Sequence, residues 1–285
     1  MGVKILTDST GYLDESVREE LGIKMVSLSV KFEDESFKET EIDNDTFYKK
    51  MAEKGVPKSS QPAIGEIIHE MEATAKVGDS LVGVFLSSGL SGTFSTVHMS
   101  KNMVLEKYPD AEIKIIDSKS TCMQLGFAAI VAARKAQVGG TFEEVIKVVK
   151  DNMNRSRFLF IPHNLEYLEK GGRIGRANAL LGNFLKIIPV LTVEEGVTTV
   201  LKKVRTKKKA IATMVEEMLT DMKNFGLGEI VVHHINCLQE AKEVAANIKE
   251  SLSTEIPIVD IGPVIGMHVG PGAIGIAYYT EKDRI

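Results

Sequence analysis

Short β-branched runs that alternate with amphipathic segments are the feature that most constrains the fold of this 285-residue chain. In the first half we expect strands at Val3–Leu6, Met25–Val30, Leu81–Leu86 and Ile113–Ile116. The helices expected in the same half are Asp14–Leu21, Asp45–Lys54, Ile64–Ala75, Thr93–Tyr108, Gly126–Gln137 and Phe142–Met153. This alternation predicts strand–helix units around a largely parallel sheet with flanking helices.

The pattern changes near residue 155, where we expect a second, mixed α/β domain. Arg157–Ile161 predicts a strand, and the apolar stretch "ANALLGNFLKIIPVL" (Ala177–Leu191) predicts a helix ended by Pro189. A hairpin with its turn at Glu195–Gly196 follows. The remaining elements are expected at Lys207–Asn224 and Gln239–Leu252 (helices) and at Glu229–His233, Pro257–Ile261 and Ala273–Tyr279 (strands). The chain thus divides into an N-terminal α/β domain, residues 1–155, and a C-terminal one, residues 156–285.

Composition excludes several classes of protein. A formal net charge of -4 gives no reason to expect nucleic acid or an anionic membrane surface as the main partner. The two cysteines, Cys122 and Cys237, lie far apart and form no metal-binding spacing, which favours a reducing, cytoplasmic location. His233 and His234 are adjacent on a strand and face opposite ways, so we expect no metal site. No apolar run is long enough to span a bilayer, so no stable membrane insertion is expected.

Polar segments follow three of the expected strands. They read "TDST" (Thr7–Thr10), "LSSGLSGT" (Leu86–Thr93) and "DSKST" (Asp117–Thr121), and a fourth polar loop is "PKSSQPA" (Pro57–Ala63). Each Ser, Thr or Asp alone is most simply a helix N-cap. Because ligands of open parallel sheets bind outside the carboxyl ends of the strands, the recurrence favours a binding site at this edge.

The segment "LSSGLSGT" is the most informative of these loops. No Lys follows its glycines as in a phosphate-binding P-loop, and their spacing is not that of a dinucleotide fingerprint. Ser91 is followed directly by Gly92, which excludes the nucleophile elbow of hydrolases. A turn remains whose backbone N–H groups and hydroxyls, on Ser91 and Thr93, favour binding an anion.

Two further features leave alternatives open. His268 lies among the glycines and prolines of "DIGPVIGMHVGPGAIG", either at the edge of a cleft or in the core against a backbone carbonyl. The segment "LKKVRTKKKA" (Leu201–Ala210) holds six basic residues, which form either a solvated face or a docking patch for an acidic or phosphate-carrying partner. It lacks interleaved aromatic residues, so binding of single-stranded nucleic acid is not supported.

Seven motifs occur in an order that resembles the DegV family, whose members include the fatty-acid-binding FakB subunits of bacterial fatty acid kinase. The motifs are "DST", "KSSQPA", "LSSGLSGT", "IDSKS", "LEKGGRIG", "KVRT" and "HVGPGAIG", and they span nearly the whole chain. The resemblance implies a two-domain DegV-like fold in which the C-terminal domain closes an internal acyl tunnel. It also implies that the protein is not an enzyme alone and needs no cofactor. Such a protein presents the carboxylate of a fatty acid, such as palmitate, stearate or oleate, to a separate kinase, which phosphorylates it with ATP to acyl phosphate.

The resemblance also implies roles for individual residues. The carboxylate site falls on Ser59, Ser91 and His268, with Ser60, Thr93 and Arg173 as additional site residues. Arg205 of "KVRT" matches a position associated with docking of the kinase. The family usually has Thr-Ser where this chain has Ser59–Ser60, so the hydroxyl is kept and a methyl group is lost.

Two other functions are compatible with the sequence. One is an enzyme that acts on a small phosphorylated or carboxylated metabolite at the strand-end site, although no Lys, metal cluster or nucleophile–base pair stands out there. The other is a regulatory protein that uses Leu201–Ala210 as a partner surface without any ligand chemistry.

Overall fold

The computed structural model describes residues 2–181 and 187–284, and it divides into two units that do not follow the chain in order. The first unit comprises Met1–Glu41 and Lys58–Asn154, and the second comprises Ile42–Pro57 and Arg155–Ile285. The second unit therefore takes in a short segment from the N-terminal part of the chain.

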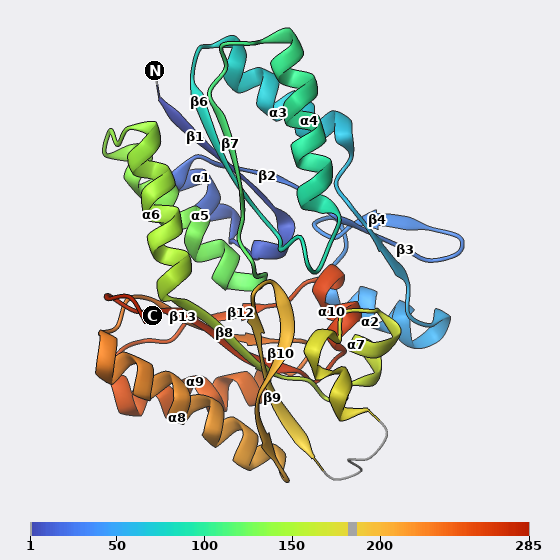
Figure 1. Ribbon diagram of the computed structural model, residues 1–285. Coiled ribbons are helices and arrows are strands. Elements are labelled where there is room, and N and C mark those ends of the chain that lie inside the picture. The colour runs from blue at the N-terminus through green and yellow to red at the C-terminus, as the bar shows by residue number, and fades with distance from the viewer. Residues whose placement is uncertain (1, 182–186, 285) are drawn as a thin grey trace. The chain divides into compact units, whose positions relative to one another are not determined.

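A four-stranded parallel sheet forms the centre of the first unit (Figure 1). Its strands run in the order β2 (Ile23–Val26), β1 (Val3–Asp8), β6 (Ser80–Phe85) and β7 (Ile113–Asp117). Helices α3 (Ile64–Lys76) and α4 (Thr93–Lys107) lie on one face. The other helices of this unit are α1 (Glu15–Leu21), α5 (Cys122–Gln137) and α6 (Phe142–Arg155), and a 3-10 turn, η1, spans Ser9–Gly11. The expected parallel sheet with flanking helices is confirmed.

A small antiparallel sheet accompanies this unit and corrects one strand prediction. It consists of β4 (Ser36–Lys38), β3 (Ser29–Lys31) and β5 (Lys58–Ser60). The single strand expected at Met25–Val30 is wrong, because β2 ends at Val26 and the chain enters the second sheet at Ser29. Both halves of the stretch are apolar and extended, so hydrophobic pattern alone does not reveal the change of sheet.

The second unit is built on a mixed six-stranded sheet. The strands run in the order β10 (Val197–Val204), β9 (Ile188–Glu194), β8 (Ser156–Ile161), β13 (Ile274–Tyr279), β11 (Ile230–His234) and β12 (Ile258–Asp260). Helices α8 (Lys207–Phe225) and α9 (Leu238–Leu252) cover one face, where Leu159, Met214 and Val244 share one buried core. Helices α2 (Asn44–Lys54), α7 (Glu166–Lys170) and α10 (Pro263–Val269) form a second group, in which α10 contacts both others.

The predicted hairpin is confirmed and the apolar helix before it is wrong. Glu195 and Gly196 both have positive φ, at 50° and 83°, as a two-residue turn between antiparallel strands requires. Gly175–Leu180 is a 3-10 helix, η2, and Pro189 lies within β9 rather than at the end of a helix. The part of that prediction on residues 182–186 lies outside the described residues.

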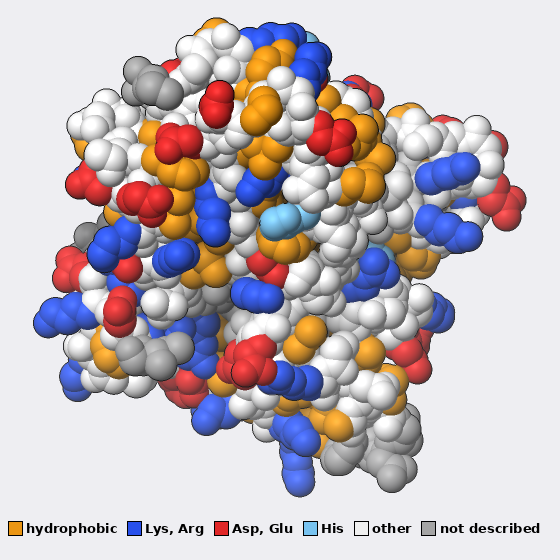
Figure 2. All heavy atoms as spheres, turned by 45° about the horizontal axis from the view of Figure 1, so that its top comes forward, with side chains coloured by type: hydrophobic (Ala, Val, Ile, Leu, Met, Phe, Trp, Pro, Cys, Tyr) orange, Lys and Arg blue, Asp and Glu red, His pale blue; other side chains and the backbone are white. Residues whose placement is uncertain are grey.

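The surface carries mixed charge. On the face shown in Figure 2, Lys and Arg side chains are interspersed with Asp and Glu, as a small net charge predicts. Within residues 2–181 and 187–284, no helix combines the length and the apolar character needed to cross a membrane.

Candidate functional site

Asp8 fixes the start of the loop that carries Ser91. Its carboxylate is almost fully buried and accepts hydrogen bonds from the Leu86 N–H (2.7 Å) and from the Thr10 N–H (3.0 Å) and hydroxyl (2.6 Å). Burial raises the pKa of Asp8, while these hydrogen bonds act in the opposite direction. The Asp8 side chain, at the end of β1, thereby holds the segment that follows β6 in place by a hydrogen bond.

The polar segment after β7 is hydrogen-bonded to the same loop, Leu86–Thr93. Ser88 donates its hydroxyl hydrogen to Asp117 at 2.5 Å, and the Ser87 N–H donates to the Ser120 carbonyl at 2.9 Å. The three polar segments predicted to meet at one edge of the parallel sheet therefore do meet there.

Ser91 and Thr93 form a pair of hydroxyls at the N-terminus of α4. Their oxygens are 2.9 Å apart, and Ser91 Oγ also accepts the Thr93 N–H at 3.2 Å. When Thr93 donates to Ser91, both lone pairs of Ser91 Oγ are engaged and its own hydrogen is left to donate to an acceptor. The positive end of the 15-residue helix favours an anion as that acceptor.

Gln61 links the "KSSQPA" loop to the same helix, and sequence reasoning missed it. Its Oε1 accepts a hydrogen bond from the Thr96 hydroxyl, and its side chain packs so closely on Gly92 that a Cβ there would collide with Nε2. Gln61 follows the edge strand β5, in which Ser59 is half-buried and Ser60 is exposed. Successive strand residues face opposite ways, so only one of these two hydroxyls can face any given ligand.

His268 lies on α10 in the second unit, against the glycines of "EKGGR". It is 8% exposed, and a Cβ on Gly171 would collide with its Nδ1. Burial lowers the pKa of His268 to about 4, and the positive charge of Arg173 acts in the same direction. The imidazole is therefore neutral at pH 7 and can donate one N–H.

Arg173 is brought near His268 by a tight turn. Its Nη1 donates to the Gly171 carbonyl at 2.6 Å, and its own carbonyl accepts the Thr198 hydroxyl at 2.8 Å. These two bonds fasten the segment between α7 and η2 to the hairpin.

The basic segment Leu201–Ala210 is largely paired with acidic residues. Lys202 lies 3.4 Å from Glu217, Lys207 2.6 Å from Glu240 and Lys209 3.7 Å from Glu216. Arg205 and Lys208 are exposed and have no ion-pair partner within the described part of the chain. Three of the six basic residues therefore form ion pairs within the protein, and the role of the segment as a solvated face or a docking patch stays a prediction.

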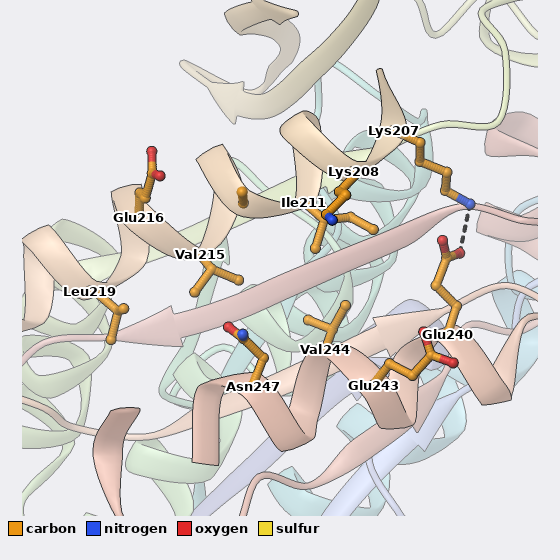
Figure 3. Close-up of a pocket in the computed structure, with 11 residues that line it drawn as sticks. Lys207, Lys208, Ile211, Val215, Glu216, Leu219, Glu240, Glu243, Val244 and Asn247 are labelled. Carbon is orange, nitrogen blue, oxygen red and sulfur yellow. Dashed lines mark hydrogen bonds and ion pairs between the residues drawn. The ribbon is translucent and has the colours of Figure 1, made fainter. Parts of the chain in front are cut away.

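A cleft of about 650 Å³ lies beside this segment, between α8 and α9 (Figure 3). Ile211, Val215, Leu219 and Val244 give it an apolar floor, and the Lys207–Glu240 ion pair closes one end. None of the predicted carboxylate-binding residues lines this cleft.

The six-stranded sheet has a second apolar face, turned away from α8 and α9. Phe158 and Phe160 are stacked there with ring centroids 5.1 Å apart, and Leu191 is fully buried. Gly275 pairs with Phe160, and a Cβ at Gly275 would lie 2.9 Å from the ring of Phe158, so the aromatic side chain packs directly over this glycine.

The predicted site residues fall on both units. The first unit holds Ser59, Ser60, Ser91 and Thr93, of which the last two touch, while the second holds His268, Arg173 and Arg205. Their part in binding a ligand stays a prediction. Among the residues that the structure describes, no group of three or more His, Cys, Asp or Glu side chains could hold a metal ion.

Comparison with known proteins agrees along the whole chain. A family profile described as "Uncharacterised protein, DegV family" matches residues 2–281. A DegV domain-containing protein of Clostridium acetobutylicum is 59% identical over 283 residues, which are 99% of this chain and 99% of that protein.

Solved structures agree equally well. The crystal structure of DegV, a fatty acid binding protein from Bacillus subtilis, has a TM-score of 0.90 at 33% identity, over 98% of this chain and 99% of that one. A stearic acid-binding protein from Eubacterium ventriosum has a TM-score of 0.88 at 25% identity, over 98% of both chains. The resemblance seen in the motifs and the expected α/β fold are both confirmed. The chain belongs to the DegV family.

Proposed function

We propose that this protein binds a long-chain fatty acid and holds its carboxylate with the hydroxyls of Ser59 and Ser91 and the imidazole of His268. The observation that carries the proposal is the Ser91–Thr93 hydroxyl pair, which leaves one hydrogen to donate at the positive end of α4. Ser60, Thr93 and Arg173 support these groups from the neighbouring positions.

Neutral donors suit a carboxylate that must later react. Each charge-assisted hydrogen bond contributes about 1.5–3 kcal/mol, and no lysine is required to hold the anion. Because His268 is neutral at pH 7, it donates a hydrogen bond without adding a permanent countercharge. The carboxylate oxygen then keeps its nucleophilic character toward a phosphoryl group.

The acyl tail belongs, in this proposal, against the second face of the six-stranded sheet. Phe158, Phe160 and Leu191 supply apolar side chains on that face. Burying about fourteen methylenes at about 0.8 kcal/mol each gives a gross ~11 kcal/mol, much of which is offset by ordering the chain. Affinity therefore comes mainly from the tail, and the polar groups fix its orientation. The relatives from B. subtilis and E. ventriosum are described as binding fatty acid and stearic acid, which supports the same ligand class here.

The fatty acid serves as substrate for a separate kinase. A carboxylate oxygen of the bound fatty acid attacks the γ-phosphorus of ATP, the bond to the β-phosphate oxygen breaks, and acyl phosphate and ADP result. Lys208 lines the α8–α9 cleft, whose apolar floor suits a protein partner, and Arg205 is an exposed cation three residues before it in the chain. The protein is in this view a cytoplasmic carrier without a cofactor and not an enzyme by itself.

Ser91→Ala tests whether the Ser91 hydroxyl binds the carboxylate of the fatty acid. We expect the variant to bind oleate about tenfold more weakly, because one hydrogen bond to a charged group is lost. Isothermal titration of delipidated protein measures the affinity.

Ser95→Ala is the matched control, since Ser95 is an exposed hydroxyl in the first turn of the same helix. Oleate affinity unchanged in Ser91→Ala, or reduced equally in Ser95→Ala, would remove Ser91 from the site.

A further inference from the structure

Helix α2 and its flanks cross from one unit to the other and back. Ile42–Pro57 packs with the second unit, although the residues before and after it belong to the first. The chain leaves this segment directly into β5, which carries Ser59 and Ser60. Only Gly55–Pro57 separate the end of α2 from the strand that carries these hydroxyls.

The start of α2 is bonded to the end of β12. Asn44 Nδ2 donates to Asp260 Oδ2 at 2.6 Å and to the Ile261 carbonyl at 3.3 Å. The other carboxylate oxygen of Asp260 lies 3.3 Å from Nδ1 of His234, a buried residue at the end of β11. Asp43 caps the helix separately by accepting the Thr46 N–H at 2.9 Å.

The face of α2 that carries Asn44 also packs on α10, the helix that carries His268. Phe47, Tyr48 and Met51 are all buried there. Tyr48 lies so close to Gly266 that a Cβ at position 266 would collide with its hydroxyl. Gly266 is two residues before His268, so the place of Tyr48 sets the place of α10 at this point.

We propose that Asn44 is a positioning residue for the fatty acid site: through its bond to Asp260 it anchors α2, and α2 fixes both α10 with His268 and the start of β5 with Ser59. The inference rests on the proposed function and adds a residue that touches no part of the ligand. Removing the anchor leaves the helix intact but lets it shift, so the Ser59 hydroxyl and the His268 imidazole are each displaced within their own unit.

Exchanging the two side chains tests the contact itself. Asn44→Asp places a second carboxylate against Asp260 while keeping a residue that favours a helix N-terminus. We expect this variant to bind oleate about fivefold more weakly, because both hydrogen bonds that the Asn44 amide donates are lost. In the double variant Asn44→Asp/Asp260→Asn the amide at position 260 donates to the carboxylate at position 44, which restores the shorter of the two bonds, and most of the lost affinity returns. Asp43→Ala removes the cap without touching the anchor and serves as the control for helix stability.

A second measurement reports on position rather than stability. The imidazole proton resonances of His268, assigned by their absence in His268→Ala, are expected to shift in ligand-free Asn44→Asp and to return in the double variant. Wild-type affinity with unmoved resonances in Asn44→Asp, or a double variant as weak as the single one, would overturn the inference. Failure of the wild type to bind oleate would instead overturn the proposed function.

Discussion

At the level of single residues, two glycines near His268 are explained by what packs on them. Gly171 faces the His268 ring, and Gly266 faces the Tyr48 hydroxyl. At both positions a methyl group would displace a side chain that the proposed site depends on. The glycine-rich segments around His268 thus serve close packing more than flexibility.

The depressed pKa of His268 predicts a pH dependence of stability. The ordinary histidine pKa is 6.5 and that of His268 is about 4, so the unfolded chain binds this proton more readily between these values. The free energy of unfolding therefore rises with pH in this range, and acidification from near pH 7 to near pH 4 costs up to about 3 kcal/mol through this residue.

His268→Gln should remove the part of the acid-induced loss of stability that comes from protonation of His268. Urea unfolding of ligand-free protein near pH 7 and near pH 4.5 measures the loss of stability in the variant and in the wild type. Burial also lowers the pKa of His233 to about 4, and because His233 is present in both proteins its contribution cancels in the comparison. An equal loss of stability in variant and wild type would show that His268 is not desolvated as described.

At the scale of elements, the link between the β5–α3 loop and α4 deserves a direct test through Gly92. Gly92→Ala should push the Gln61 side chain away, break its bond to Thr96 and weaken oleate binding. Gly65→Ala is the matched control, because a Cβ there meets nothing within 4 Å. Alanine in helix α3 should stabilise the protein by up to about 1 kcal/mol and leave binding unchanged.

Oleate titration and thermal unfolding of both variants separate these outcomes. Equal behaviour of Gly92→Ala and Gly65→Ala would mean that Gln61 does not position the loop.

Helices and strands were predictable from the sequence where their hydrophobic periodicity was strong and their length was usual for the type of element. Apart from β2, the strands of the parallel sheet, the helices around it and the pair α8 and α9 follow from the sequence within a few residues. Helix α10 was missed, because its seven residues include Gly266 and lie between Gly262 and Gly270. The apolar run before Pro189 was mistaken for an α-helix, because a continuous apolar run has no distinctive period and Pro189 suggested a helix end, whereas Gly175–Leu180 is the 3-10 helix η2.

At the scale of the whole molecule, the order of motifs along the chain gave the family, but the division into units could not be inferred from it. Ile42–Pro57 joins the second unit through the buried residues Phe47, Tyr48 and Met51. Their spacing is that of any amphipathic helix, so the pattern does not indicate which unit the helix packs on. Ser91, Thr93 and His268 could be named from their motifs. Gln61 and Asn44 could not be identified as site residues, because a single amide in a polar segment carries no periodic or compositional signal. The one sequence indication for Gln61 is that it lies two residues after Ser59 in "KSSQPA".

The central claim is that this chain holds a long-chain fatty acid, and native mass spectrometry of the delipidated protein tests it most directly. On addition of stearate or oleate, the account predicts a complex of one fatty acid with one protein chain that survives transfer to the gas phase. A spectrum in which the protein keeps its ligand-free mass with both fatty acids would contradict it.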